Sequence, residues 1–362
     1  MDNINFLIAF FLVGIIFILF LFLISIFGYF FFYIITKRSE KNVLKKSNLI
    51  LERFLISFGI GISVYISYGY ILNLFNLFNF FTAYICILFF DIGFIIYYII
   101  RNKRINLSKS YLLKIKTFFF NRARIISGLI VLIIFISSFL LYWDITTESL
   151  GLLRRDPYMW LEHVYYLIEN GSITLETLGY GYPSGFVFIT SGSLLIWPDY
   201  LMVYFFMKLA AIFYLFLYIL ISFVILKHLF KSKFLVFFSL LLLYLSNFFL
   251  SRNILNIASS FASILVLISF LLIVKDYPIY IQGFILAALF LIHPLTFFFH
   301  FIVLSAYVLF KIFSNIRNRH LVLKELGSIF FLLIITLILF IPYFTNYPEE
   351  ILDLYNFYQN IV

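Results

Sequence analysis

Residues that could do chemistry gather in one short stretch of this chain, RRDPYMWLEHVYYLIENG, at residues 154–171. Asp156 provides a carboxylate, which can act as a general base or bind a divalent metal ion. Arg154 and Arg155 provide guanidinium groups, which bind phosphate well because their planar fork forms paired hydrogen bonds. The stretch therefore combines a carboxylate with two cations that could hold a phosphate group.

Each of these residues also has a purely structural interpretation. Asp156 can cap a helix that begins at the following proline, and the two arginines can contact lipid headgroups or pair with Glu148. Glu162 and His163 follow Asp156 by about two helical turns, a spacing that places one of them loosely on its side. Asp144 and Glu148 come just after an apolar run, as solvated charges at a helix end or as further acids of the same site.

The composition places this stretch in a membrane protein. Of the 362 residues, 64% are hydrophobic and 12% are charged, with a mean hydropathy of +1.10, whereas soluble domains carry about 25% charged residues. Apolar runs of about 20 residues, the length of a membrane span, recur along the chain. They predict an all-α polytopic membrane protein with ten transmembrane helices, at residues 5–36, 54–76, 81–100, 125–143, 200–226, 234–250, 254–274, 277–292, 295–313 and 327–345.

The basic residues predict how these helices are oriented. With the N-terminus outside, five loops lie inside and together carry 22 of the 26 lysines and arginines. These loops are residues 37–53, 101–124, 227–233, 275–276 and 311–326. Because basic residues accumulate in cytoplasmic loops, we expect a multi-pass protein of the cytoplasmic membrane with both termini external. The net charge of +10 is then explained by these loops, and no nucleic-acid partner is expected.

The 154–171 stretch falls in the one long external loop of this topology, residues 144–199. Within it, apolar residues at helical spacing predict an amphipathic helix of about three turns that lies on the membrane surface and stops at Asn170-Gly171. After the glycine-rich GYGYPSGF, residues 186–197 are too short to span a bilayer and are interpreted as a second interfacial or re-entrant segment.

The order of motifs in this loop resembles the first external loop of membrane glycosyltransferases of the GT-C class. It is most similar to the catalytic subunit of oligosaccharyltransferase and its archaeal relatives. The matching residues are Asp156-Pro157-Tyr158, the IENG of 168–171, and Tyr182-Pro183-Ser184-Gly185. The resemblance implies a GT-C-like membrane core at residues 125–362, preceded by a three-helix membrane segment with basic cytoplasmic loops at residues 1–124.

The resemblance also implies an activity and the residues that carry it. Asp156 would bind the catalytic divalent metal, Mg²⁺ or Mn²⁺, and sugar would pass from a polyprenyl-phosphate carrier at the outer face. The chemistry of the side chains, rather than the resemblance, makes Arg154, Arg155, Tyr182, Arg252 and His293 the candidates for binding the donor. Of these, Arg252 belongs to SRNILNIASS (251–260) and His293 to LIHPLTFFFH (291–300), segments similar to the outer ends of GT-C spans.

The chain departs from the family at several points. Glu162 replaces the arginine that usually follows the Asp-Pro motif, which makes it a second candidate catalytic carboxylate, with Asp144, Glu148 and His163 as secondary candidates. A second acidic pair and the Trp-Trp-Asp-Tyr-Gly motif are absent, which argues against protein N-glycosylation itself. The alternatives are a non-catalytic GT-C relative and a multi-helix transporter or lipid flippase. Asp91 and Lys208 fall inside predicted spans, where ionisable groups are costly and usually face partners or water. They could pair with each other or line a lipid-carrier groove, or Lys208 could extend its amine to the membrane surface.

Overall fold

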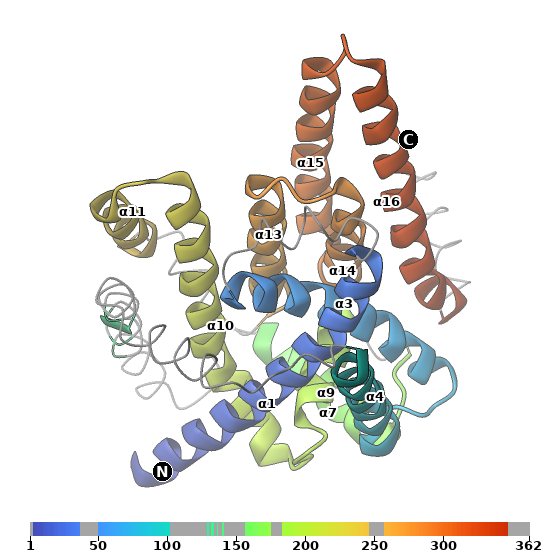
Figure 1. Ribbon diagram of the computed structural model, residues 1–362. Coiled ribbons are helices and arrows are strands. Elements are labelled where there is room, and N and C mark those ends of the chain that lie inside the picture. Colours follow the sequence, from blue (N-terminus) through green and yellow to red (C-terminus); the bar gives the residue numbers. More distant parts are fainter. Residues whose placement is uncertain are drawn as a thin grey trace, which may run out of the picture.

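The computed structural model describes residues 3–36, 50–101, 156–174, 183–245 and 257–346, together with positions 129, 132, 133, 136 and 140. These residues form an all-α membrane protein (Figure 1). The helices in chain order are α1 (Asn3–Thr36), α3 (Ile50–Leu74), the π-helical turn η2 (Phe81–Ile85), α4 (Cys86–Arg101), α7 (Asp156–Asn170), α9 (Gly185–Leu194), α10 (Tyr200–Leu229), α11 (Lys233–Leu245), α13 (Ala258–Val274), the 3₁₀ turn η3 (Ile279–Ile281), α14 (Gln282–Ile292), α15 (Pro294–Ser314) and α16 (Arg319–Asn346).

A helix lies at nine of the ten sites where the sequence predicts a span. Five of these helices are long and apolar enough to cross a membrane, namely α1, α3, α10, α15 and α16. The described parts of α4, α11, α13 and α14 are apolar but shorter. The span predicted at 125–143 is described at five positions, all helical and exposed. Ten spans therefore remain a prediction.

The last predicted helix begins earlier than hydropathy indicates. The apolar run suggests a start at residue 327, but α16 begins at Arg319. The side chain of Asn318 explains the difference, because its Oδ1 accepts a hydrogen bond from the backbone N–H of Leu321 at 3.3 Å. Such a cap fixes a helix start whether or not the first turns are apolar. The correct boundary is thus set by a cap and not by the membrane.

Two helices cross at a pair of glycines in the core. Gly28 of α1 and Gly61 of α3 lie so close that a β-carbon on Gly28 would overlap the carbonyl oxygen of Ser57 and one on Gly61 would overlap that of Ile24. Small residues allow this approach of two backbones, which strengthens van der Waals contact between helices where no hydrophobic force from water acts. The α1–α3 crossing therefore depends on both glycines.

The short helix α9 is enclosed by protein. All ten of its residues are buried, and it packs against α3, α7 and α14. Of the two alternatives predicted for residues 186–197, an interfacial segment does not fit the buried α9, whereas a re-entrant segment stays a prediction. The reason for the burial is the composition of the helix, because its small residues, such as Gly192 and Ser193, let neighbouring helices approach from every side.

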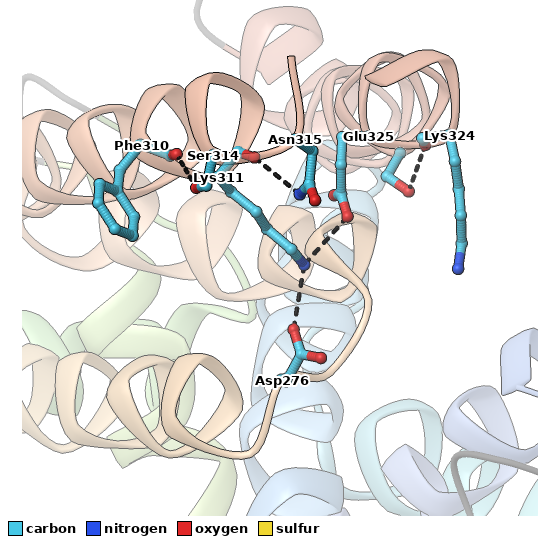
Figure 2. A network of polar contacts seen from close by, with 8 residues as sticks. Asp276, Phe310, Lys311, Ser314, Asn315, Lys324 and Glu325 are labelled. Carbon is cyan, nitrogen blue, oxygen red and sulfur yellow. Dashed lines mark hydrogen bonds and ion pairs between the residues drawn. The ribbon is translucent and has the colours of Figure 1, made fainter. Parts of the chain in front are cut away.

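Acidic and basic side chains pair with one another at one end of the helix bundle. At this end α3 and α16 begin, and α13 and α15 end. Glu52 is fully buried and pairs with Lys275, with 2.9 Å between Oε2 and Nζ; the Tyr277 hydroxyl donates to its Oε1 at 3.1 Å. Lys311 contacts both Asp276 and Glu325, each at 3.1 Å (Figure 2). We call these five charged residues the charged end of the bundle.

The charged end bears on the predicted topology. Glu52, Lys275, Lys311 and Glu325 lie in or beside three loops that the sequence assigns to one side of the membrane. In Figure 1, α15 and α16 extend away from the other helices, and α7 and α9 lie at the opposite side of the molecule. The described residues of these three loops therefore lie together, whereas the side of the membrane that they face stays a prediction.

Candidate functional site

Helix α7 spans Asp156–Asn170, and one face of it is buried in the bundle. This face includes Trp160, Val164 and Leu167, none of them more than 4% exposed. It packs against α9 and α10, and the hydroxyl of Ser191 in α9 donates a hydrogen bond to the carbonyl of Val164 at 3.2 Å. The predicted apolar face therefore exists and is covered by protein.

The segment that follows α7 is held by the side chain of Asn73, which Asn346 contacts in turn. Gly171 has the left-handed φ of 71° that is typical of a residue that ends a helix. Two residues later, Ile173 exchanges two hydrogen bonds with Asn73 of α3: its N–H donates to Oδ1 at 2.7 Å, and its carbonyl accepts from Nδ2 at 3.0 Å. Asn346 of α16 accepts from the same Nδ2 at 3.0 Å. The three elements α3, α7 and α16 are thus joined at this point.

We expect Asn73→Ala to destabilise this junction. Asn73 is buried, so its removal leaves the buried N–H and carbonyl groups of Ile173 without these hydrogen bonds, at a cost of about 1–3 kcal/mol. Thermal unfolding in detergent measures the effect. Asn170→Ala is the matched control, because Asn170 is exposed and its side chain bonds only back to Tyr166 within the described contacts. Equal unfolding temperatures for the two variants would show that Asn73 does not stabilise this junction.

The first turns of α7, α9 and α13 meet through a chain of aromatic rings. Trp160 of α7 lies edge-on to Phe186 of α9, with 5.3 Å between ring centroids, and Phe186 lies 6.5 Å from Phe261 of α13. Each of these residues is within the first five of its helix. Because helix N-termini carry partial positive charge and unpaired N–H groups, three such ends in one neighbourhood favour an anion.

The junction between α14 and α15 lies beside the same helix ends. A β-carbon on Gly185, the first residue of α9, would overlap the carbonyl oxygen of Leu291 near the end of α14. The helix α15 begins three residues later, after His293. His293 is therefore carried close to the start of α9 by a contact that only glycine permits.

His293 has a structural role that the sequence interpretation missed. Its Nδ1 accepts a hydrogen bond from the backbone N–H of Thr296 at 3.2 Å and lies 2.8 Å from the Thr296 hydroxyl, so that the ring caps α15. A histidine directly before a proline at a helix start was the available signal.

The structure describes some of the predicted site residues. Glu162 is exposed and His163 is buried, with its ring 6.0 Å from that of Trp160. The backbone of Asp156 begins α7. The remaining candidates lie outside the described residues: Asp144, Glu148, Arg154, Arg155, Tyr182 and Arg252. The structure therefore places Glu162 on the exposed side of α7 and His163 on the buried side. How the other predicted site residues lie relative to these two stays a prediction.

The exposed part of α7 carries tyrosine and acid side chains. Glu169 accepts a hydrogen bond from the Tyr165 hydroxyl one turn earlier and thereby raises the pKa of Tyr165. Tyr165 also lies edge-on to Tyr200 at the start of α10, with 5.0 Å between centroids. These contacts attach α7 to α10 and leave Glu169 outside the buried face.

Two further expectations are a metal-binding site and an ion pair between Asp91 and Lys208. The described residues contain no group of three or more His, Cys, Asp or Glu side chains that could hold a metal ion. Asp91 and Lys208 do not pair, because both carboxylate oxygens of the buried Asp91 lack a hydrogen-bond partner among the described residues. An ion pair between α4 and α10 is therefore not formed.

Comparison with protein-family models, with curated proteins and with solved structures gives no match to this chain.

Proposed function

We propose that this protein is a glycosyltransferase of the GT-C type, which transfers sugar from a polyprenyl-phosphate donor at the outer face of the cytoplasmic membrane. In this proposal the chain has ten spans, and residues 144–199 form the external loop that carries the catalytic carboxylate. The bond between the anomeric carbon of the sugar and the phosphate oxygen breaks, an acceptor oxygen takes the sugar, and polyprenyl phosphate leaves.

One observation carries the proposal, namely the position of Asp156 on α7. At 100° per residue, position 156 shares a helix face with Trp160 and His163, both of which are buried. Position 162 is about 120° away from it, and Glu162 is exposed. What supports a catalytic Asp156 is thus its place on the buried side of α7, beside the converging starts of α9 and α13.

The same neighbourhood suits a phosphate leaving group. The departing phosphate gains negative charge, which helix N-termini and guanidinium groups stabilise. We propose that Arg154 and Arg155, directly before α7, and Arg252, six residues before α13, bind this group, with Tyr182 and His293 beside it. The proposed Mg²⁺ or Mn²⁺ would be bound by Asp156, with Asp144 and Glu148 as secondary candidates. Carboxylate oxygens are ligands that suit these ions.

The test is a reconstitution. Purified protein in liposomes is supplied with a polyprenyl-phosphate-linked hexose and Mn²⁺, and release of polyprenyl phosphate is measured with a membrane extract as the source of acceptor. We expect release that EDTA abolishes. Liposomes without protein and liposomes with heat-denatured protein are the controls.

Absence of release with every hexose donor and with either metal would overturn the proposal. In that case, protein-dependent movement of the intact donor between leaflets would favour the transporter or flippase alternative. A protein that neither releases polyprenyl phosphate nor moves the donor would be a non-catalytic relative.

A further inference from the structure

A groove lies between α1, α3 and α4, away from the candidate site. Its cavity has a volume of about 370 Å³, at the lower end of the range of about 300–1,000 Å³ for ligand pockets. It is lined by Phe22, Ser25, Ile26, Tyr29, Arg53, Phe54, Ser57, Phe94 and Ile95. We call it the Arg53 groove. α1 and α3 are long and apolar enough to cross a membrane and α4 is apolar but shorter, so in a bilayer the groove would face the lipid.

The walls and the end of this groove differ in polarity. The lining from α1 and α4 is almost entirely aliphatic and aromatic, which suits a hydrocarbon chain. Arg53 is four residues into α3, next to Glu52 of the charged end. The carboxylate of Glu52 is directed to Lys275 and Tyr277. The groove therefore places one guanidinium group at the membrane boundary and apolar walls deeper in.

A second polar group lies one turn further into the groove. Ser57 follows Arg53 by four residues, a rise of about one helical turn or roughly 5.4 Å. It is 1% exposed, and its hydroxyl has no hydrogen-bond partner among the described residues. An unpaired buried hydroxyl is costly in an apolar environment. A ligand that carries an acceptor at this depth would satisfy it.

We propose that the Arg53 groove binds an anionic phospholipid of the leaflet at the charged end. One acyl chain fills the apolar part between α1 and α4, the phosphate is bound by Arg53, and an ester carbonyl accepts a hydrogen bond from Ser57. A glycerophospholipid has this order of groups, with the ester one step below the phosphate. Guanidinium binds phosphate through charge-assisted paired hydrogen bonds, and anionic headgroups attract basic residues at the membrane surface.

The position of the groove separates this lipid from the proposed donor. Arg53 adjoins the charged end, whereas α7, where the donor phosphate is proposed to bind, lies at the opposite side of the molecule (Figure 1). A polyprenyl phosphate with its head at α7 cannot at the same time place that head at Arg53. The phospholipid site therefore does not depend on the proposed glycosyltransferase activity and would remain if that activity failed.

Native mass spectrometry of delipidated protein in detergent tests the proposal. Phosphatidylglycerol and phosphatidylcholine with identical chains are titrated, and the bound fraction is measured for each. We expect preferential binding of phosphatidylglycerol, weakened about 10- to 100-fold by Arg53→Gln, because one charge-assisted contact is lost. Arg317→Gln, a change at an exposed arginine in the α15–α16 turn, is the matched control and should leave the affinity unchanged.

A second variant examines the chain-binding part of the groove. Ile95 is 43% exposed at the groove edge, so Ile95→Trp can fill the groove without disturbing the core. We expect it to weaken the binding of both lipids. Equal phosphatidylglycerol binding by Arg53→Gln and Arg317→Gln would overturn the proposal. Tighter binding of polyprenyl phosphate than of phosphatidylglycerol, or equal binding of glycerol 3-phosphate without chains, would overturn it as well.

Discussion

Replacing Asp156 with asparagine is expected to abolish sugar transfer while leaving the protein folded. Asparagine keeps the size of the side chain and can still cap α7, so the packing of Trp160 and Val164 on α9 should persist. It cannot act as a base, and it is a poor ligand for the proposed metal. A positioned general base alone contributes about 10²–10⁴-fold to a rate, so we expect polyprenyl phosphate release to fall at least about 10³-fold.

The matched control for Asp156→Asn is Glu169→Gln. Glu169 is an exposed acid on the same helix, and its described contact is with Tyr165, so its loss should leave transfer unchanged. Elution volume and unfolding temperature in detergent show whether either variant is misfolded. Full transfer by folded Asp156→Asn would leave the enzyme proposal without its catalytic residue.

Gly61→Leu is expected to destabilise the fold severely. The backbones of α1 and α3 touch at Gly61, so even a β-carbon there would overlap the carbonyl of Ile24. A leucine can be accommodated only if the two helices separate, which opens the core around Ile24 and Phe58. We expect a loss of about 3 kcal/mol or more, at the upper end of overpacking effects, and largely aggregated protein after extraction.

Two further glycine variants make this prediction specific. Gly93→Leu on α4 adds the same side chain where no described atom lies within 4 Å, and it should yield a folded monodisperse protein. Gly61→Ala adds a single carbon and should give intermediate stability in thermal unfolding. If Gly61→Leu and Gly93→Leu unfold at the same temperature, the α1–α3 crossing does not depend on the absence of a side chain at Gly61.

The helices were predictable because hydropathy and capping are local properties of the sequence. Asn170-Gly171 indicates the end of α7, and Gly171 does adopt the left-handed conformation. The start of α16 was predicted eight residues too late because a hydropathy criterion ignores polar first turns such as Arg319–Leu326, which Asn318 caps. The sequence left an interfacial and a re-entrant segment open for residues 186–197, since interfacial and enclosed segments of ten residues have similar compositions, and α9 is buried.

The site was less predictable because its contacts join residues that are far apart in the chain. The pairing of Asn73 with Ile173 spans 100 residues, and that of Asn73 with Asn346 spans 273. A single sequence carries no local signal for either of them. Helical spacing places position 163 close to the face of Asp156 and position 162 about 120° away from it, but it does not show which face of α7 the bundle covers.

The charged end has a consequence for the response of the protein to ionic strength. The Glu52 carboxylate is fully shielded and Lys275 is nearly so, whereas the Asp276 side chain is 59% exposed. Dissolved salt screens exposed charges far more than buried ones. Concentrated electrolyte therefore weakens the contact between α15 and the turn at Asp276 before it affects the contact between α3 and Lys275, while α16 stays packed against α14 and α3.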